Sequence, residues 1–264
     1  MPGATESAKQ AAQAEARLAR IVRGRLNPAY KAALDARMET AMALLPVLKP
    51  IAEKHGVPVE QLLAIHIVET RGRGDPMSRT NKAGASGPFQ LTPDARKDFP
   101  PSMQYATTVE SDADSAAQYL KASRAAGFTM PEAIGMTYIA GITGVKNWGG
   151  GNEGNVGEHS KDYGPMFKYA LDKLAVQIPE YTKQQSERER AARSAGAAAR
   201  RQAFDQFPVP KMKEGIAAFF GPSEEEVTKA REARMSAAEQ AEKQAFESMR
   251  PEAPLQTMKK AGYK

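Results

Sequence analysis

Apolar residues recur at helical spacing along much of this chain, and no segment shows the alternation of apolar and polar residues that is typical of β-strands. Met42, Leu45, Leu48 and Ile51, for example, follow one another at a spacing that places them on one face of a helix. No repeat of fixed period is present either. The sequence therefore predicts an all-α protein.

The pattern of apolar residues, helix caps and helix breakers predicts where the helices lie. Thr92-Pro93 is typical of a helix start, because threonine caps a helix and proline fits its first turn. Stretches 71–87 and 141–157 are rich in glycine or small polar residues and are predicted to be loops. The predicted helices are residues 5–24, 38–54 with a kink or break near Pro46 and Pro50, 57–70, a helix starting at 92, 108–126, 131–142, 163–177 and 223–249.

Composition divides the chain into three predicted parts. Only 41% of the residues are hydrophobic and 7% are aromatic, so a compact core is not expected to use all 264 residues. Residues 1–40 have few large apolar side chains and are predicted to form a helical N-terminal arm. Residues 41–178 are predicted to form the folded domain, and residues 179–264 a charged helical C-terminal extension capped at Ser223.

The net charge of +6 is concentrated on the flanks. Residues 1–40 hold 7 basic and 4 acidic side chains, residues 41–178 hold 14 of each, and residues 179–264 hold 16 and 13, which gives +3, 0 and +3. Because the basic residues are interleaved with acids and accompanied by few aromatics, nucleic-acid binding is predicted to be weak or absent.

Three classes of feature are missing from the sequence. There is no cysteine, which excludes disulfides, thiolate metal sites and a cysteine nucleophile. No apolar stretch approaches the ~20 residues of a transmembrane helix. The first residues, Met1 to Ser7, lack the basic and apolar pattern of a secretory signal, so no export by a signal peptide is expected.

Glu69 is the first candidate for a chemical role. It ends a predicted helix whose preceding turns are almost wholly apolar, and Leu62, Ile65 and His66 share its face. Poor solvation and the negative end of the helix dipole both favour the neutral acid, which is the form that donates a proton to a glycosidic oxygen. A glutamate that simply points into water at a helix end is the structural alternative.

The second candidate segment runs from Gly84 to Pro93. Gly84 and Gly87 allow the backbone to approach a ligand closely, Phe89 offers an apolar surface to a sugar ring, and Gln90 offers an amide that can donate and accept hydrogen bonds. An ordinary turn before a helix is the alternative, although it does not explain why Gln90 lies inside an apolar stretch.

Three segments of the chain resemble, in order, the motifs of the soluble lytic transglycosylase domain, which has a lysozyme-like α-helical fold. The family's Glu-Ser is matched by Glu69-Thr70, its Gly-Ala-x-Gly-Leu-Met-Gln-(Ile/Leu)-x-Pro by residues 84–93, and its Ala-Tyr-Asn-Ala-Gly by residues 137–141. Glu158, Tyr163 and the run to Leu174 are similar to the family's closing helix. The resemblance covers roughly residues 45–177 and departs at Thr70, Pro88-Phe89 and Ile139.

The resemblance implies a lytic transglycosylase that cuts peptidoglycan glycan strands with Glu69 as its only catalytic acid and base. It implies that Gln90 and Tyr138 orient the sugar and the acid, that Thr70, Gly87 and Phe89 contribute to substrate binding, and that no metal or cofactor is needed. His55, His66 and His159 have no metal-ligand spacing and are interpreted as structural or surface residues.

Two alternatives to a transglycosylase stay open. A second carboxylate that activates water would make the protein a hydrolytic muramidase, and Asp75, Glu153 and Glu158 are the candidates. A structural protein that keeps the fold without catalysis is the other alternative. The predicted arms and the missing signal suggest a phage virion protein that binds protein partners through its arms and opens the bacterial wall during genome entry.

Overall fold

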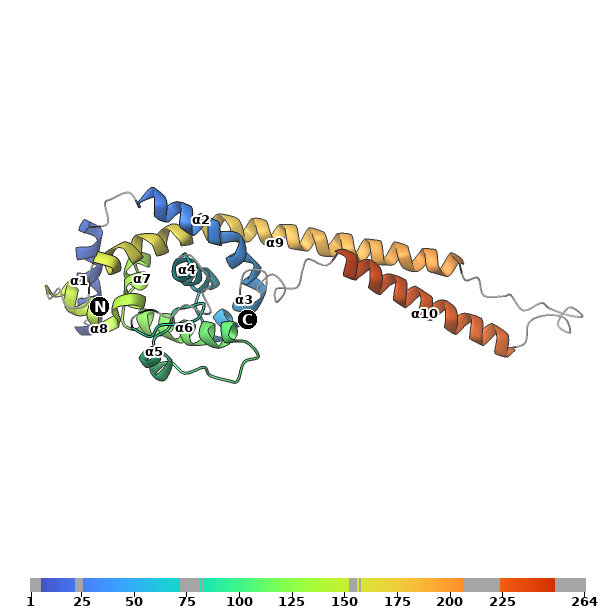
Figure 1. Cartoon of the computed structure of the whole chain (residues 1–264), viewed down its shortest axis with the longest axis horizontal. Helices are drawn as coiled ribbons and strands as arrows, with labels where there is room; N and C mark the ends of the chain where they lie inside the picture. The colour runs from blue at the N-terminus through green and yellow to red at the C-terminus, as the bar shows by residue number, and fades with distance from the viewer. Residues whose placement is uncertain are drawn as a thin grey trace, which may run out of the picture. The chain divides into compact units, whose positions relative to one another are not determined.

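A computed structural model of the chain describes residues 6–21, 26–71, 81, 83–151, 156, 158–206 and 224–249. Within these ranges every regular element is a helix, and one isolated antiparallel bridge joins Ser86 to Leu91 (Figure 1). The all-α prediction is confirmed. No helix in the described part is both long and apolar enough to cross a membrane. The predictions made for Asp75, Glu153 and the Ser223 cap fall outside the described residues.

The chain divides into two compact units, and the division falls between Ile178 and Pro179. Helix α9 contributes its first part to unit 1 and its remainder to unit 2. The elements are α1 (Glu6–Ile21), α2 (Pro28–Ala43), α3 (Leu45–His55), α4 (Val59–Thr70), α5 (Pro93–Asp98), α6 (Thr108–Ala125), α7 (Pro131–Ala140), α8 (Ile142–Gly149), α9 (Glu158–Gln206) and α10 (Glu224–Met249).

Short-range capping explains several helix boundaries. The Thr92 hydroxyl accepts a hydrogen bond from the Ala95 backbone N–H at 3.1 Å, as predicted for the start of α5. Thr107 and Glu110 form a reciprocal capping box at the start of α6. Gly56 ends α3 in the left-handed conformation, with φ +67°. These polar interactions satisfy backbone groups that a helix end leaves without partners.

Helix α4 is buried on every face in unit 1. A helix that is apolar all round has to be enclosed by other elements, and α2, α3 and α6 pack around it (Figure 1). Only Glu69, in the last turn, and the two residues of the first turn are partly exposed. The buried residues of α4 are Gln61, Leu62, Leu63, Ala64, Ile65, His66, Ile67, Val68 and Thr70.

Helix α1 belongs to unit 1, so the prediction of a separate N-terminal arm over residues 1–40 is wrong for this helix. Ala11, Ala14 and Leu18 are fully buried, and α1 packs against α8 and α7. The small side chains that suggested a surface helix instead permit close backbone contact. A Cβ atom at Gly149 would lie 2.6 Å from the Ala14 backbone nitrogen.

Polar contacts also tie α1 to the end of the domain that carries α7. The Glu15 carboxylate accepts hydrogen bonds from the backbone N–H groups of Thr129 and Met130, at 2.6 and 2.5 Å, just before α7 begins. The Arg17 guanidinium lies 4.5 Å from the centroid of the buried Trp148 ring and donates to the Trp148 carbonyl. Glu15 therefore satisfies donors at a helix start that has no side-chain cap of its own.

The helices differ from the sequence prediction in three further places. Helix α8 lies inside the glycine-rich stretch 141–157, which was predicted to be a loop; its buried Val145 and Trp148 supply the packing that outweighs the cost of glycine. The predicted helix 38–54, with its kink or break near Pro46 and Pro50, is two helices that meet at Leu44; Pro46 falls in the first turn of α3 and Pro50 lies inside it. Helix α9 begins earlier and ends later than the predicted helix 163–177.

Unit 2 consists of the later part of α9 packed against α10. Ala192, Ala203 and Ala238 are buried, so the two helices approach one another over small side chains. The Arg200 guanidinium pairs with the Glu242 carboxylate at 3.2 Å. The Arg234 guanidinium lies 4.4 Å from the centroid of the Phe204 ring. Small side chains, one ion pair and one cation–π contact thus join the two helices.

We expect Gly149→Ala to destabilise the protein, because its Cβ would meet backbone atoms of Ala14 that cannot give way separately. Overpacking of this kind costs about 1–3 kcal/mol. Gly150→Ala is the matched control, because its Cβ would meet only ordinary contacts, the nearest at 3.5 Å. Thermal unfolding followed by circular dichroism measures both. Equal melting temperatures for the two variants would contradict the close packing of α1 on α8.

Candidate functional site

Glu69 does not simply point into water. It lies in the last turn of α4, is partly exposed, and its Oε1 accepts a hydrogen bond from the Tyr163 hydroxyl at 2.8 Å. Tyr163 comes from α9 and is 1% exposed. A buried phenol held in the core thus fixes one oxygen of a carboxyl group that still reaches solvent.

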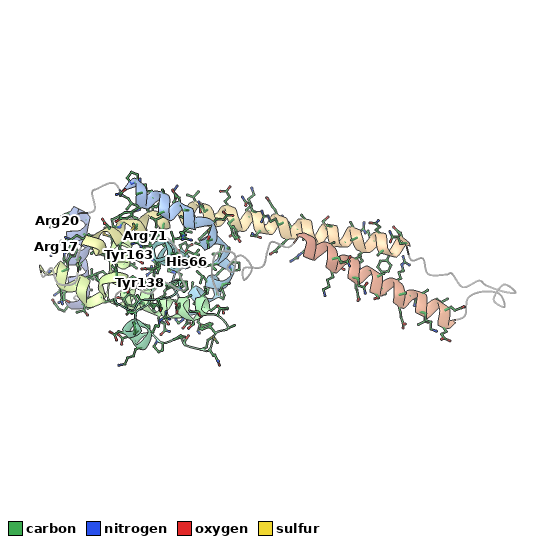
Figure 2. All side chains as sticks on the ribbon, in the orientation of Figure 1. Arg17, Arg20, His66, Arg71, Tyr138 and Tyr163 are labelled. Carbon is green, nitrogen blue, oxygen red and sulfur yellow. The ribbon has the colours of Figure 1, made fainter. Side chains whose placement is uncertain are left out.

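A row of aromatic rings continues from Tyr163. The Tyr138 ring stacks on it with centroids 6.3 Å apart and planes at 25°, and the Tyr119 ring meets Tyr138 edge-on at 5.5 Å. Phe99 in turn meets Tyr119 at 5.0 Å. Figure 2 shows Tyr138 and Tyr163 in the same part of unit 1 as His66 and Arg71. The rings pack together segments from α5, α6, α7 and α9.

Both phenols next to the carboxyl group keep their protons. Burial raises the pKa of Tyr163 well above its ordinary value, and the nearby Glu69 carboxylate acts in the same direction. Burial likewise raises the pKa of Tyr138, aided by the charges of Glu69 and Asp112. Tyr163 and Tyr138 therefore act as hydrogen-bond donors throughout the physiological pH range.

The second predicted segment forms a tight turn from Ser86 to Leu91. The backbones of these two residues pair in both directions, at 3.2 and 3.1 Å. Gly87 has φ +79° and Gln90 has φ +45°, the latter in the left-handed region that a residue with a side chain rarely adopts. Such a conformation persists only where the surroundings impose it.

Each carbonyl from residue 86 to residue 89 is held by a donor. The Gln90 side-chain amide donates to the Gly87 oxygen at 2.9 Å, and the Tyr138 hydroxyl donates to the Phe89 oxygen at 2.8 Å. His66 bonds the Pro88 backbone, which can only accept. The Ser86 oxygen accepts from Arg96 at 2.9 Å as well as from Leu91. The turn is therefore fixed from α4, α5 and α7 together.

Gly87 lies directly on a buried carboxylate. A Cβ atom at this position would come within 2.2 Å of Asp112 Oδ2, so only glycine fits. Asp112 is fully buried in α6 and receives two hydrogen bonds from the Arg96 guanidinium of α5. Burial raises the pKa of Asp112, whereas the Arg96 charge and hydrogen bonds oppose that rise. The close backbone approach seen at Gly87 is therefore to Asp112.

The predicted site residues lie in different environments. Tyr138 is partly exposed, whereas the Phe89 side chain is fully buried against His66, with ring centroids 5.7 Å apart. The Phe89 ring is therefore not at the surface, where a sugar could stack on it. Thr70 is 1% exposed, and its hydroxyl donates to the His66 carbonyl at 2.6 Å. Gln90 is 9% exposed.

Sequence reasoning did not assign roles to Arg96, Asp112 or the link between Tyr163 and Glu69. One signal was available for Asp112, which lies on the apolar face of its predicted helix, three residues after Val109 and four before Ala116. An acid in such a position needs a partner when it is buried. Nothing in the local pattern indicated which cation would supply it.

A separate polar cluster surrounds Asp114, which is fully buried and lies on α6, as Asp112 does. Its carboxylate accepts hydrogen bonds from the Tyr105 hydroxyl at 2.5 Å and the Ser102 backbone N–H at 2.7 Å, and it pairs with His55 at 2.6 Å. These hydrogen bonds hold the pKa of Asp114 far below its usual range, although burial raises it. The cluster fixes the segment between α5 and α6.

Within the described residues, no group of three or more histidine and acidic side chains is arranged to hold a metal ion. His66 is buried in the core and His55 pairs with Asp114, so both have the structural roles that were predicted. Of the proposed second carboxylates, Asp75 and Glu153 lie outside the described residues. Glu158 begins α9, but the structure does not describe its side chain or that of His159.

Comparison with known proteins yields no relative. No protein-family model matches the chain, and no curated protein or solved structure matches it. Functional inference therefore depends on the site's own geometry and on the motifs in the sequence.

We expect His66 to make the protein less stable in acid. Burial lowers the pKa of His66 from its ordinary value of 6.5 to about 4, so in this pH range the unfolded chain binds a proton that the folded protein does not. Stability is lost as pH falls from about 6.5 towards about 4, by up to roughly 3 kcal/mol for this shift. Urea unfolding of the wild type and His66→Gln at several pH values measures the difference.

The two proteins in this comparison share all other titrating groups, so only the difference between their pH profiles is assigned to His66. We expect a shallower loss of stability in His66→Gln between pH 6.5 and 4. Parallel profiles would show that His66 gains its proton in the folded state as readily as in the unfolded chain.

Proposed function

We propose that this chain is a peptidoglycan lytic transglycosylase in which Glu69 is the catalytic acid and base. The observation that carries the proposal is the hydrogen bond from the buried Tyr163 hydroxyl to a partly exposed Glu69 carboxyl group. This pair lies beside Tyr138, whose own hydroxyl is bound to the turn at Phe89. The three motif segments thus meet around one accessible carboxyl group.

In the proposed reaction, Glu69 donates its proton to the glycosidic oxygen between N-acetylmuramic acid and N-acetylglucosamine. The bond from that oxygen to C1 of the muramic acid breaks, and the C6 hydroxyl of the same sugar bonds to C1. Its proton passes to the Glu69 carboxylate, which restores the acid. The product is a 1,6-anhydromuramoyl end, and no water is consumed.

Asp112 is unsuited to be a second catalytic carboxylate beside Glu69. The Asp112 charge, like that of Glu69, raises the pKa of Tyr138, but Asp112 is fully buried and accepts two hydrogen bonds from Arg96. A carboxylate in that state cannot reach and activate a water molecule on a bound sugar. Hydrolysis by an Asp112 and Glu69 pair is therefore disfavoured.

The first test compares the wild type with Glu69→Gln on insoluble peptidoglycan, with the released ends identified by mass spectrometry. We expect anhydromuramoyl ends from the wild type and a rate about 10²- to 10⁴-fold lower from the variant, because general acid and base catalysis is lost. Glu60→Gln is the matched control: it removes the same charge from the first turn of the same helix, away from Tyr163.

Other products would support the competing functions. Reducing ends would indicate hydrolysis and a second carboxylate. If the folded wild type releases no glycan and Glu69→Gln still binds the wall, the chain is a structural or glycan-binding protein. Two structural features favour this alternative most: the Phe89 ring is buried, and the Gln90 amide donates to the Gly87 carbonyl within the same turn.

We expect Tyr163→Phe to lower the rate of glycan release by about ten- to a hundredfold, because it removes one hydrogen bond to a group that is charged during the reaction. The ring, and therefore its packing against Tyr138, is retained. Tyr169→Phe is the control, since that hydroxyl bonds Asp35 instead. A Tyr163→Phe rate equal to that of the wild type would remove Tyr163 from the proposed site.

We also propose that the protein acts from a phage particle on the bacterial wall. The small-residue helix pair of unit 2, with its polar surface, supports a role in contacts with other virion proteins, but it carries no binding specificity by itself. Mass spectrometry of purified particles tests this location, and absence of the chain from them would exclude it.

A further inference from the structure

Asp112 and Asp114 are two buried aspartates on one helix with different surroundings. Residues two apart on a helix point to nearly opposite sides. Asp112 faces Arg96 and the turn at Gly87, whereas Asp114 faces Ser102, Tyr105 and His55. Both are fully buried. Helix α6 therefore sends one carboxylate towards the candidate site and one towards a different segment.

The Asp112 carboxylate and Arg96 form a bridge to the turn. Arg96 donates from Nη1 and Nη2 to the two carboxylate oxygens of Asp112. Its Nη2 also donates to the Ser86 carbonyl at 2.9 Å. The planar guanidinium can serve both partners at once, which a lysine could not do with the same geometry. Gly87, the next residue, rests on the carboxylate itself.

The far side of the turn leads to the reactive group. The Phe89 carbonyl accepts from the Tyr138 hydroxyl at 2.8 Å, and the Tyr138 ring stacks on Tyr163. Tyr163 then donates to Glu69 at 2.8 Å. Since Gln90 holds a positive φ, the turn needs external contacts to keep this shape, and the bridge to Asp112 is one of the contacts that supply them.

We propose that Asp112 is a positioning residue for Glu69. Through Arg96 it seats the turn from Ser86 to Leu91, which keeps the Phe89 carbonyl bound to Tyr138 and thereby holds Tyr138 and Tyr163 against the carboxyl group. Asp112 touches no substrate in this scheme. The role of Asp112 in catalysis rests on the proposed transglycosylase function. Whether Asp112 holds the turn in place is a property of the fold and can be measured without activity.

The test compares full-length Asp112→Asn with Asp114→Asn, a matched change on the same helix, below the unfolding temperature of both. On soluble, uncross-linked glycan strands we expect Asp112→Asn to lower kcat by about tenfold with KM changed less than about twofold, because the acid is misplaced while most of the binding surface remains. We expect Asp114→Asn to change kcat by less than about twofold.

Hydrogen exchange of single amides provides the readout that does not need activity. The N–H groups of Gln90 and Leu91 donate within the turn, whereas that of Ser102 donates to Asp114. We expect Asp112→Asn to speed exchange at Gln90 and Leu91 by about tenfold or more and to leave Ser102 unchanged. We expect the reverse pattern in Asp114→Asn. A general loss of stability would speed all three amides in both variants.

Arg96→Lys separates charge from geometry. It keeps the cation but loses the planar group that reaches Asp112 and Ser86 together, so we expect the same fast exchange at Gln90 and Leu91 as in Asp112→Asn. Normal kcat in Asp112→Asn, equal losses in the two aspartate variants, or unchanged exchange in the turn would each overturn the proposal. If the wild type releases no glycan, the proposed function fails, and the exchange pattern alone decides whether Asp112 seats the turn.

Discussion

The burial of α4 on every face is the constraint on which unit 1 depends. A helix with apolar residues all round cannot lie on a surface, so α2, α3 and α6 must enclose it. Only the ends of such a helix can reach solvent. Glu69 occupies its last turn, and the core therefore determines where the one accessible carboxyl group of this helix end can lie. Aromatic side chains of α7 and α9 lie beside it.

Charge inside the domain is used to fix segments that have little regular structure. Asp112 holds the turn before α5 through Arg96, and Asp114 holds the segment between α5 and α6 through Ser102 and Tyr105. A buried carboxylate is costly unless it is paired and hydrogen-bonded, so each of these segments has one arrangement that satisfies its acid. The two acids on α6 thereby give defined shapes to chain that apolar packing alone would leave loosely specified.

The candidate site places a partly exposed carboxyl group beside two phenols that stay protonated. Tyr138 and Tyr163 stay protonated because loss of solvation and nearby negative charge raise their pKa values, and Asp112 is held in its ion pair. Glu69 is the carboxyl group of this cluster that is partly exposed, whereas Asp112 is fully buried. Such an arrangement suits one carboxyl group that gives and then takes a proton, which is the chemistry proposed for the chain.

The sequence by itself determined the properties that arise from neighbouring residues. Helical spacing specified the all-α class, Thr92 with Pro93 specified a helix start, and the apolar run before Glu69 marked that residue as unusual. Only the tertiary structure decided which segments meet. Tyr163 donates to Glu69, which lies 94 residues earlier in the chain, and Arg96 pairs with Asp112 and not with another acid. Helix α1 is buried because Gly149 allows the Ala14 backbone to come close. These contacts depend on how helices pack in space, and local propensity and periodicity carry no information about that choice of partner.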